Sequence, residues 1–210
     1  LDSFNLGKGL SLSLTNFDLN FINRFVNPKK VTCRGKIYDF DVKINDVFNL
    51  QGINTYISTD TVFINNVPYG DVTGNFEMAH LAAPLWWKTF LNYQDHQLRI
   101  AGAWLPPKAS AQMIDEVQMT VKPGEFATQV DARNFPLNIL ETFVPGISGT
   151  NGQFDAGLKL FGPFNKIGMN GKVRIVKGQF ELDYLKAKYN IFNQNILLTS
   201  NRIWANGDTI

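Results

Sequence analysis

The sequence predicts an all-β protein built around one elongated antiparallel sheet. Apolar residues recur at every second position through most of the chain, as expected for strands with one buried face. Glycine, asparagine and proline interrupt these runs at short intervals, as hairpin turns require. A block of several strands occurs twice, which indicates stacked copies of one unit. With 210 residues, 44% of them hydrophobic, the chain can form a single globular domain.

The clearest strand covers residues 36–44, KIYDFDVKI. Its alternation predicts two faces: Tyr38, Phe40, Val42 and Ile44 on one, and Ile37, Asp39, Asp41 and Lys43 on the other. The stretch 152–180 alternates in the same way, with Phe154, Ala156, Leu158 and Leu160 followed by Met169, Gly171, Val173 and Ile175. Further strands are expected at 72–78, 97–105, 116–121, 126–132 and 193–199.

Three short segments break the alternation and predict peripheral helices: residues 17–26, 83–93 and 136–144. The second of these, APLWWKTFLNY, groups Trp86 and Trp87 with other apolar residues. We expect such a helix to pack on the sheet or to cap one end of it.

An internal repeat is the most informative feature of the sequence. At an offset of 118, the residues Asn16, Phe17, Leu19, Asn20, Phe25 and Val26 recur as Asn134, Phe135, Leu137, Asn138, Phe143 and Val144. At an offset of 116, Val42, Lys43, Ile44, Phe48, Asn49 and Gly52 recur as Leu158, Lys159, Leu160, Phe164, Asn165 and Gly168. We therefore expect a single domain over 1–210, with copies at about 10–78 and 126–199 that are linked by 79–125.

The composition argues against several functions. The formal charge is only +2, from 20 Lys and Arg against 18 Asp and Glu, which gives no electrostatic case for nucleic-acid binding. Cys33 is the single cysteine, and His80 and His96 form no metal or nucleophile motif. The glycines near residue 168 lack the Gly-Lys-Ser/Thr ending of a phosphate loop. We expect no enzyme activity, no metal and no cofactor.

The chain has no apolar run near the roughly 20 residues of a membrane-spanning helix. The longest candidate, residues 81–87, is far shorter. Both ends of the sequence lie within alternating or strand-like stretches, and we expect the chain to be an interior piece of a longer protein.

Residues 134–204 contain a spaced pattern of apolar residues and glycines: Ile147, Gly149, Gly152, Gly162, Gly171, Val173, Ile175, Gly178, Phe180, Leu185, Tyr189 and Asn190. In this pattern the segment resembles the TamB family, the inner-membrane component of the translocation and assembly module. The earlier copy matches more loosely, and Lys166 stands where many relatives have proline. The membrane anchor and the extreme C-terminal segment of the family are absent from these residues.

The resemblance implies a curved sheet folded into a trough, a β-taco, which conducts phospholipid acyl chains through the periplasm between the inner and outer membranes. The full-length protein would be anchored in the inner membrane and would support outer-membrane biogenesis. The residues expected to line the lipid groove are Tyr38, Phe40, Val42, Ile44, Phe154, Leu158, Leu160, Met169, Val173 and Ile175.

Two alternatives stay open. Periodicity by itself favours the closed core of a sandwich or barrel over an open groove, and the resemblance reverses that preference. The chain could also be an assembly scaffold whose sheet edges pair with another β-protein, such as an outer-membrane β-barrel partner.

Overall fold

The computed structural model describes residues 8–25, 32–139, 141, 146–200 and 202–206. Its elements are a 3₁₀ helix, η1 (Leu19–Arg24), and strands β1 (Leu10–Asp18), β2 (Cys33–Arg34), β3 (Lys36–Asp46), β4 (Gln51–Thr59), β5 (Val62–Ile64), β6 (Val67–Met78), β7 (Leu85–Tyr93), β8 (His96–Trp104), β9 (Gln112–Ile114), β10 (Met119–Val121), β11 (Phe126–Pro136), β12 (Ile147–Gly162), β13 (Gly168–Leu182), β14 (Ala187–Thr199) and β15 (Arg202–Asn206). The all-β prediction is confirmed.

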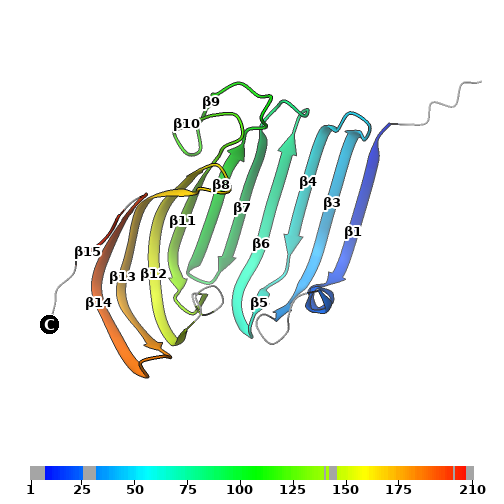
Figure 1. Ribbon diagram of the computed structural model, residues 1–210. Helices are drawn as coiled ribbons and strands as arrows, with labels where there is room; N and C mark the ends of the chain where they lie inside the picture. The colour runs from blue at the N-terminus through cyan, green and yellow to red at the C-terminus, as the bar shows by residue number, and fades with distance from the viewer. Residues whose placement is uncertain (1–7, 26–31, 140, 142–145, 201, 207–210) are drawn as a thin grey trace, which may run out of the picture.

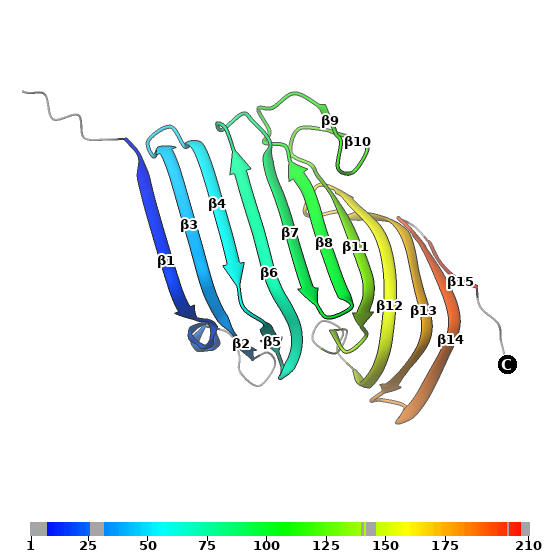
Figure 2. The same ribbon diagram turned by 180° about the vertical axis from the view of Figure 1, so that it is seen from behind.

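Thirteen of the described strands form one open antiparallel sheet, and β9 and β10 form a separate two-stranded hairpin. Its main path is β1-β3-β4-β6-β7-β8-β11-β12-β13-β14-β15, with β2 and β5 attached beside β6. The ribbon views show a single curved layer, with β1 and β15 at its two edges (Figures 1 and 2). Neighbouring strands lie about 4.8 Å apart, so the ten steps along this path span about 48 Å of sheet.

A single layer buries little of its surface. The chain exposes 13636 Å², whereas a compact monomer of 23.7 kDa exposes about 9,800 Å². The large side chains that are fully buried are Leu105, Ile114 and Val117. All three belong to residues 105–121, where the β9–β10 hairpin folds back over one end of the sheet (Figure 1).

The two copies of the repeat share a backbone hydrogen bond to a glycine with positive φ. The amide of Leu19 donates to the carbonyl of Gly35 at 3.0 Å, and the amide of Leu137 donates to that of Gly152 at 2.9 Å. Both glycines have positive φ, 140° and 110°. In strand order, β1, β3, β4, β6 and β7 correspond to β11, β12, β13, β14 and β15, and β8 lies between the two sets. The correspondence therefore extends one strand beyond each copy expected from the sequence.

The change of offset from 118 to 116 has two structural causes. Leu19 and Gly35 are 16 residues apart, whereas Leu137 and Gly152 are 15 apart, so the first copy has one additional residue in the connection after its helix. The second additional residue of the first copy is Tyr38. Ile37 pairs with Thr59 and Asp39 with Ser58, which leaves Tyr38 as the extra residue of a β-bulge.

The bulge corrects the predicted face of Ile37. In β4, Thr59 lies two residues from Ile57, the partner of Phe40, and directly paired residues share a face. Ile37 therefore lies on the face of Phe40, not with Asp39, and it is buried.

The helix predictions had mixed outcomes. Residues 19–24 form a 3₁₀ helix within the predicted 17–26. The prediction at 83–93 is wrong, because Leu85–Tyr93 is strand β7, hydrogen-bonded to β6 and β8. In 136–144, Ile139 and Glu141 are helical, Pro136 ends β11, and residues 140 and 142–144 lie outside the described part. Of the predicted strand 116–121, only Met119–Val121 is extended, because a turn occupies 115–118.

Candidate functional site: the apolar face

Direct cross-strand pairing places apolar residues in continuous rows along one face of the sheet. The central row is Leu14, Phe40, Ile57, Gly74, Thr89, Ile100, Val130, Leu158, Gly171 and Leu198. A second row is Leu12, Val42, Thr55, Phe76, Trp87, Gly102, Thr128, Leu160 and Met169. A third, on the other side of the central row, is Val72, Leu91, Leu98, Ala132, Ala156, Val173 and Ile196. We call these three rows the apolar face.

The opposite face of the same strands is mostly polar. One of its rows is Ser13, Asp41, Tyr56, Asn75, Lys88, Ala101, Gln129, Lys159 and Asn170. We call this side the polar face. The separation agrees with the period-2 side-chain pattern of a half-buried sheet.

Nothing among the described residues covers the middle of the apolar face. Phe40, Ile57, Ile100, Val130 and Leu158 are each only partly buried. The β9–β10 hairpin packs on the other side: its core includes Ala103 and Ala127, which alternate with Gly102 and Thr128 of the apolar face. The polar face is thus the one that receives a sealed cluster, and the apolar face stays open.

One end of the apolar face is closed by its own side chains. Tyr69, Ala132 and Phe135 form a buried cluster, against which Leu98, Ile139 and other partly buried residues pack. The Tyr69 hydroxyl donates to Asn138 Oδ1 at 3.3 Å. Burial, followed by the nearby charge of Glu141, raises the pKa of Tyr69 to about 12. The helical segment after β11 therefore forms a wall at this end of the face.

Two polar groups of the apolar face, the Trp87 indole and the Thr128 hydroxyl, are satisfied internally. Trp87 Nε1 donates to Thr128 Oγ1 at 3.1 Å, and the Thr128 hydroxyl donates to the carbonyl of Ala101 at 3.0 Å. A buried hydroxyl and an indole that bond each other present no free donor to an apolar ligand.

Most of the predicted groove residues lie on this face. Phe40, Val42, Leu158, Leu160, Met169 and Val173 belong to its rows. Ile44 is two residues from Val42 and pairs with Leu10, whereas Phe154 pairs with Ile175 beside Ala156 and Val173. Ile175 is already buried at 5% exposure, and Phe154 packs on the Phe135 cluster, so these two belong to the closed end.

Tyr38 is separate from the others. As the bulge residue it has no partner in β4, its ring centroid lies 6.0 Å from Lys36 Nζ, and it is 44% exposed. The Asp60 carboxylate, followed by desolvation, raises the pKa of the phenol. Tyr38 therefore has charged neighbours, in contrast to the residues of the apolar rows.

Sequence reasoning missed the contribution of the central strands. Trp87 and Leu91 lie on the apolar face because β7 is a strand, whereas Trp86 faces the other way and packs on the β9–β10 cluster. The alternation of Leu85, Trp87, Thr89 and Leu91 is the signal in the sequence that indicates this strand.

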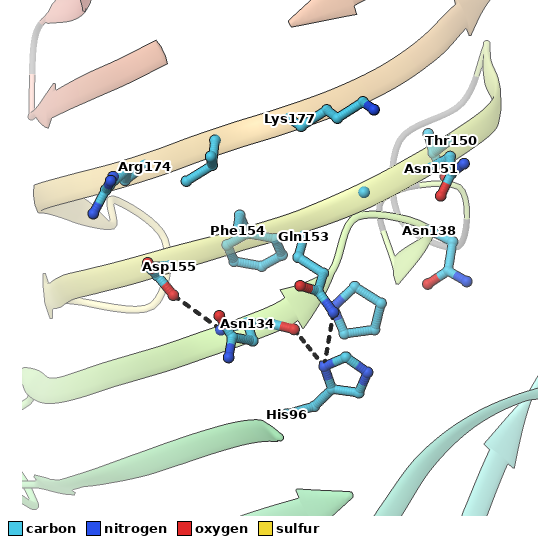
Figure 3. A pocket seen from close by; sticks show the side chains of 13 residues that line it. His96, Asn134, Asn138, Thr150, Asn151, Gln153, Phe154, Asp155, Arg174 and Lys177 are labelled. Atoms are coloured by element: carbon cyan, nitrogen blue, oxygen red, sulfur yellow. Dashed lines mark hydrogen bonds between the residues drawn. The ribbon is translucent and has the colours of Figure 1, made fainter. Parts of the chain in front are cut away.

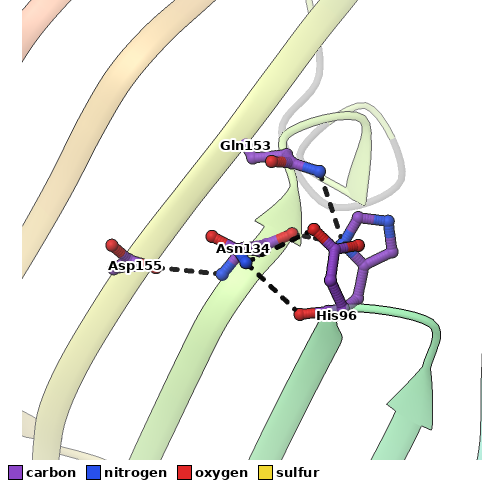
Figure 4. A network of polar contacts seen from close by, with 5 residues as sticks. His96, Asn134, Gln153 and Asp155 are labelled. Atoms are coloured by element: carbon purple, nitrogen blue, oxygen red, sulfur yellow. Dashed lines mark hydrogen bonds and ion pairs between the residues drawn. The ribbon is translucent and has the colours of Figure 1, made fainter.

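A separate polar pocket of about 520 Å³ lies near the ends of β11, β12 and β13 (Figure 3). His96 Nδ1 lies 2.5 Å from the carbonyl oxygen of Asn134, and the backbone N–H of Asn134 donates to Asp155 Oδ1 at 2.9 Å (Figure 4). These contacts hold Asn134 in a left-handed conformation with φ of 49°. The register of β11 against β12 shifts between Ala132 and Phe135, which marks a β-bulge, and we assign this network a structural role there.

The described residues contain no group of three His, Cys, Asp or Glu side chains that could hold a metal ion. Among them, no helix is long and apolar enough to cross a membrane. No protein-family model matches the sequence, and no curated protein and no solved structure matches it.

Proposed function

We propose that the apolar face conducts phospholipid acyl chains, as a segment of a periplasmic path between the inner and outer membranes. The observation that carries this proposal is the continuous, uncovered central row from Leu14 to Leu198. The periplasmic setting and the phospholipid cargo rest on the resemblance of residues 134–204 to the TamB family.

The physical argument concerns both binding and movement. Each CH₂ group removed from water contributes about 0.8 kcal/mol, so an acyl chain gains affinity without any specific polar contact. The rows repeat about every 4.8 Å across the sheet, so displacement by one strand exchanges one set of apolar contacts for a similar set. A surface of this kind holds a chain in many equivalent positions, which suits transport better than storage at one site.

The extent of the face also supports a role beyond a protein core. Single exposed apolar patches on soluble monomers cover a few hundred Å² and larger ones mark interaction surfaces. Together the three rows cross β3 to β14, and none of their residues is charged. The absence of fixed charge in these rows removes any strong anchor that would trap a moving lipid.

Organic extraction tests the proposal. The protein is purified without detergent from the periplasm of a Gram-negative host, extracted, and analysed by mass spectrometry, with a closed-core β-protein prepared identically as the control. We expect phospholipid in clear excess over the control. Its repeated absence would contradict the proposal and favour the scaffold, whose sheet edges pair with another β-protein.

A further inference from the structure

Three turns at one end of the sheet carry exposed apolar side chains. They join β3 to β4, β6 to β7 and β12 to β13, and they lie at the same end because the strands alternate in direction (Figures 1 and 2). Phe48 is 85% exposed, Leu81 53% and Phe164 65%. Each turn is flanked on both sides by further strands of the sheet, so none of the three lies at a sheet edge. The same turns also expose Val47, Leu50 and Ile167.

The exposed phenylalanine is part of the internal repeat. Phe48-Asn49 and Phe164-Asn165 correspond at the offset of 116, and each pair lies in the turn that follows the equivalent strand, β3 or β12. Turns favour glycine, proline, asparagine, aspartate and serine for their backbone geometry, and phenylalanine has no such advantage. An exposed phenylalanine at the same place in both copies therefore indicates a contact made outside the turns.

The turns also border the apolar face. The row of this face nearest to them includes Ile44, which pairs with Ile53, and Trp104, which pairs with Phe126. The rings of Phe126 and Phe164 are stacked, with centroids 4.8 Å apart. The tip of the β12–β13 turn is thus continuous with the apolar face, whose other end is the one closed by the Tyr69 cluster.

Backbone amides of these turns are hydrogen-bonded within the turns themselves. Asp46 Oδ1 accepts from the amide of Phe48 at 3.0 Å, and His80 Nδ1 accepts from the amide two residues further on at 3.2 Å. The amide of Lys166 donates to the carbonyl of Pro163 at 2.9 Å. Because an unpaired amide is costly to remove from water, these bonds lower the cost of placing the turns in an apolar medium.

A lipid surface fits the three turns better than a protein surface does. At about 4.8 Å for each strand, the first two turns are about 10 Å apart and the last two about 19 Å apart. Polar residues such as Asn49 and Asn165 lie between the apolar tips. A stable protein interface needs a continuous patch of about 800 Å² on each partner, whereas fluid lipids can surround separate side chains.

The charged groups near the tips fit the headgroup layer of a membrane. Lys166 is two residues from Phe164, and Lys8 Nζ lies 4.0 Å from Asp46 Oδ2 behind Phe48. Basic side chains beside inserted apolar ones are typical of proteins that bind at the membrane interface, because they attract anionic lipids.

We propose that these three turns bind the surface of a lipid bilayer, with Phe48, Leu81 and Phe164 inserted at the boundary between headgroups and acyl chains. The apolar face then meets the membrane at the end bordered by the turns. This inference goes beyond the proposed lipid path, and membrane binding by the turns is measured separately from transport along the face.

Co-sedimentation with vesicles of phosphatidylethanolamine and phosphatidylglycerol tests the proposal on the full chain. We expect the protein to bind, and Phe48→Ser with Phe164→Ser to weaken binding at least about tenfold. The matched control is Tyr184→Ser, since Tyr184 is 77% exposed in the β13–β14 turn at the opposite end. Absence of vesicle binding, or equal weakening in the Tyr184→Ser variant, would overturn the proposal.

An environment-sensitive dye tests insertion at single positions. In a Cys33→Ser background, the dye is attached to Phe48→Cys or to Tyr184→Cys, and vesicles are added. We expect a blue shift of emission from position 48 and little change from position 184. Equal shifts at both positions, or self-association of the protein that Phe48→Ser abolishes in the absence of vesicles, would contradict a lipid surface as the partner.

The variant Leu158→Asp separates this inference from the proposed lipid path. We expect it to keep vesicle binding, since Leu158 lies in the central row of the apolar face and not in a turn. Loss of vesicle binding in a folded Leu158→Asp protein, with binding retained in Phe48→Ser, would assign the contact to the apolar face and contradict the role of the turns.

Discussion

Asn16 and Asn134, which are 118 residues apart, have the same left-handed backbone conformation, with φ of 56° and 49°. Each is followed by a phenylalanine and lies just before a helical segment. Asparagine tolerates this region better than other residues with a Cβ. The shared conformation reverses the side-chain parity, so that Leu14 and Phe17, three residues apart, pair with Phe40 and Ile37 on one face.

Asn134→Ala should therefore destabilise the fold. Alanine in a left-handed conformation costs about 1–2 kcal/mol, and the variant also loses the long side-chain contacts of Asn134 Nδ2 with Asp95 at 3.4 Å. Asn134→Gly, which adopts the same φ freely, should recover most of the loss. Urea unfolding measures both, and equal stability of the two variants would show that the conformation is not what asparagine provides.

A charge on the apolar face should impair lipid binding more than folding. Leu158 is only partly buried, so an aspartate there keeps contact with water, whereas an aspartate in place of the fully buried Ile114 is sealed from it. We expect Leu158→Asp to stay folded and lose lipid crosslinking, and Ile114→Asp to unfold or to express poorly.

The matched control for Leu158→Asp is Asn170→Asp, which adds the same charge to the polar face beside Lys159. Circular dichroism and photo-crosslinking to a labelled phospholipid would distinguish the variants. Unfolding of Leu158→Asp would place this residue in a closed core, and equal crosslinking in both variants would contradict the proposed lipid path.

Gly171 should not tolerate a side chain. A Cβ at this position would lie 2.2 Å from the carbonyl oxygen of Gly157 on the neighbouring strand, so the backbone itself would have to move. We expect Gly171→Ala to lower the free energy of unfolding by about 2 kcal/mol or more. At Gly157 the added Cβ would meet only Asp131 Oδ1 at 3.9 Å, so Gly157→Ala should be neutral or slightly stabilising. Denaturant unfolding of the pair checks the contrast.

Stability should fall at alkaline pH because of Tyr69. Its pKa is about 12 in the folded protein, whereas an unfolded tyrosine titrates near 10. Between these values the unfolded chain loses its proton first, so the contribution of Tyr69 is fully present below pH 10 and declines towards pH 12 by at most about 2–3 kcal/mol. Tyr69→Phe should remove this part of the decline, with little effect at neutral pH, because its hydrogen bond to Asn138 is long at 3.3 Å. Unfolding of both proteins at pH 9 and at about pH 11.5 tests it; parallel losses would contradict the assignment.

Much of the architecture could be predicted from alternation alone. The alternation predicts β3 and β8 to within two residues of each end and predicts part of β6, β11 and β14, and the parity of Phe40 and Leu158 agrees across the sheet. The apolar positions of β12 and β13 could likewise be assigned to one face. Local side-chain period is enough for this, because each strand must present one face to water.

Other features required the folded chain. The segment 85–93 contains apolar residues at both helical and strand spacing, and its pairing with β6 and β8 decides for the strand. The bulge at Tyr38, which moves Ile37 to the apolar face, has no signature in the alternation.

The sequence by itself determined that the protein is a repeated antiparallel sheet with one apolar and one polar face. The tertiary structure decided which of these faces is covered. Residues 105–121 fold back over the polar face and bury Ile114 and Val117 there, while Phe40 and Leu158 stay partly exposed on the apolar one. The physical reason is that alternation records only which side chains are apolar; whether a second layer covers them depends on contacts between segments that are distant in the chain.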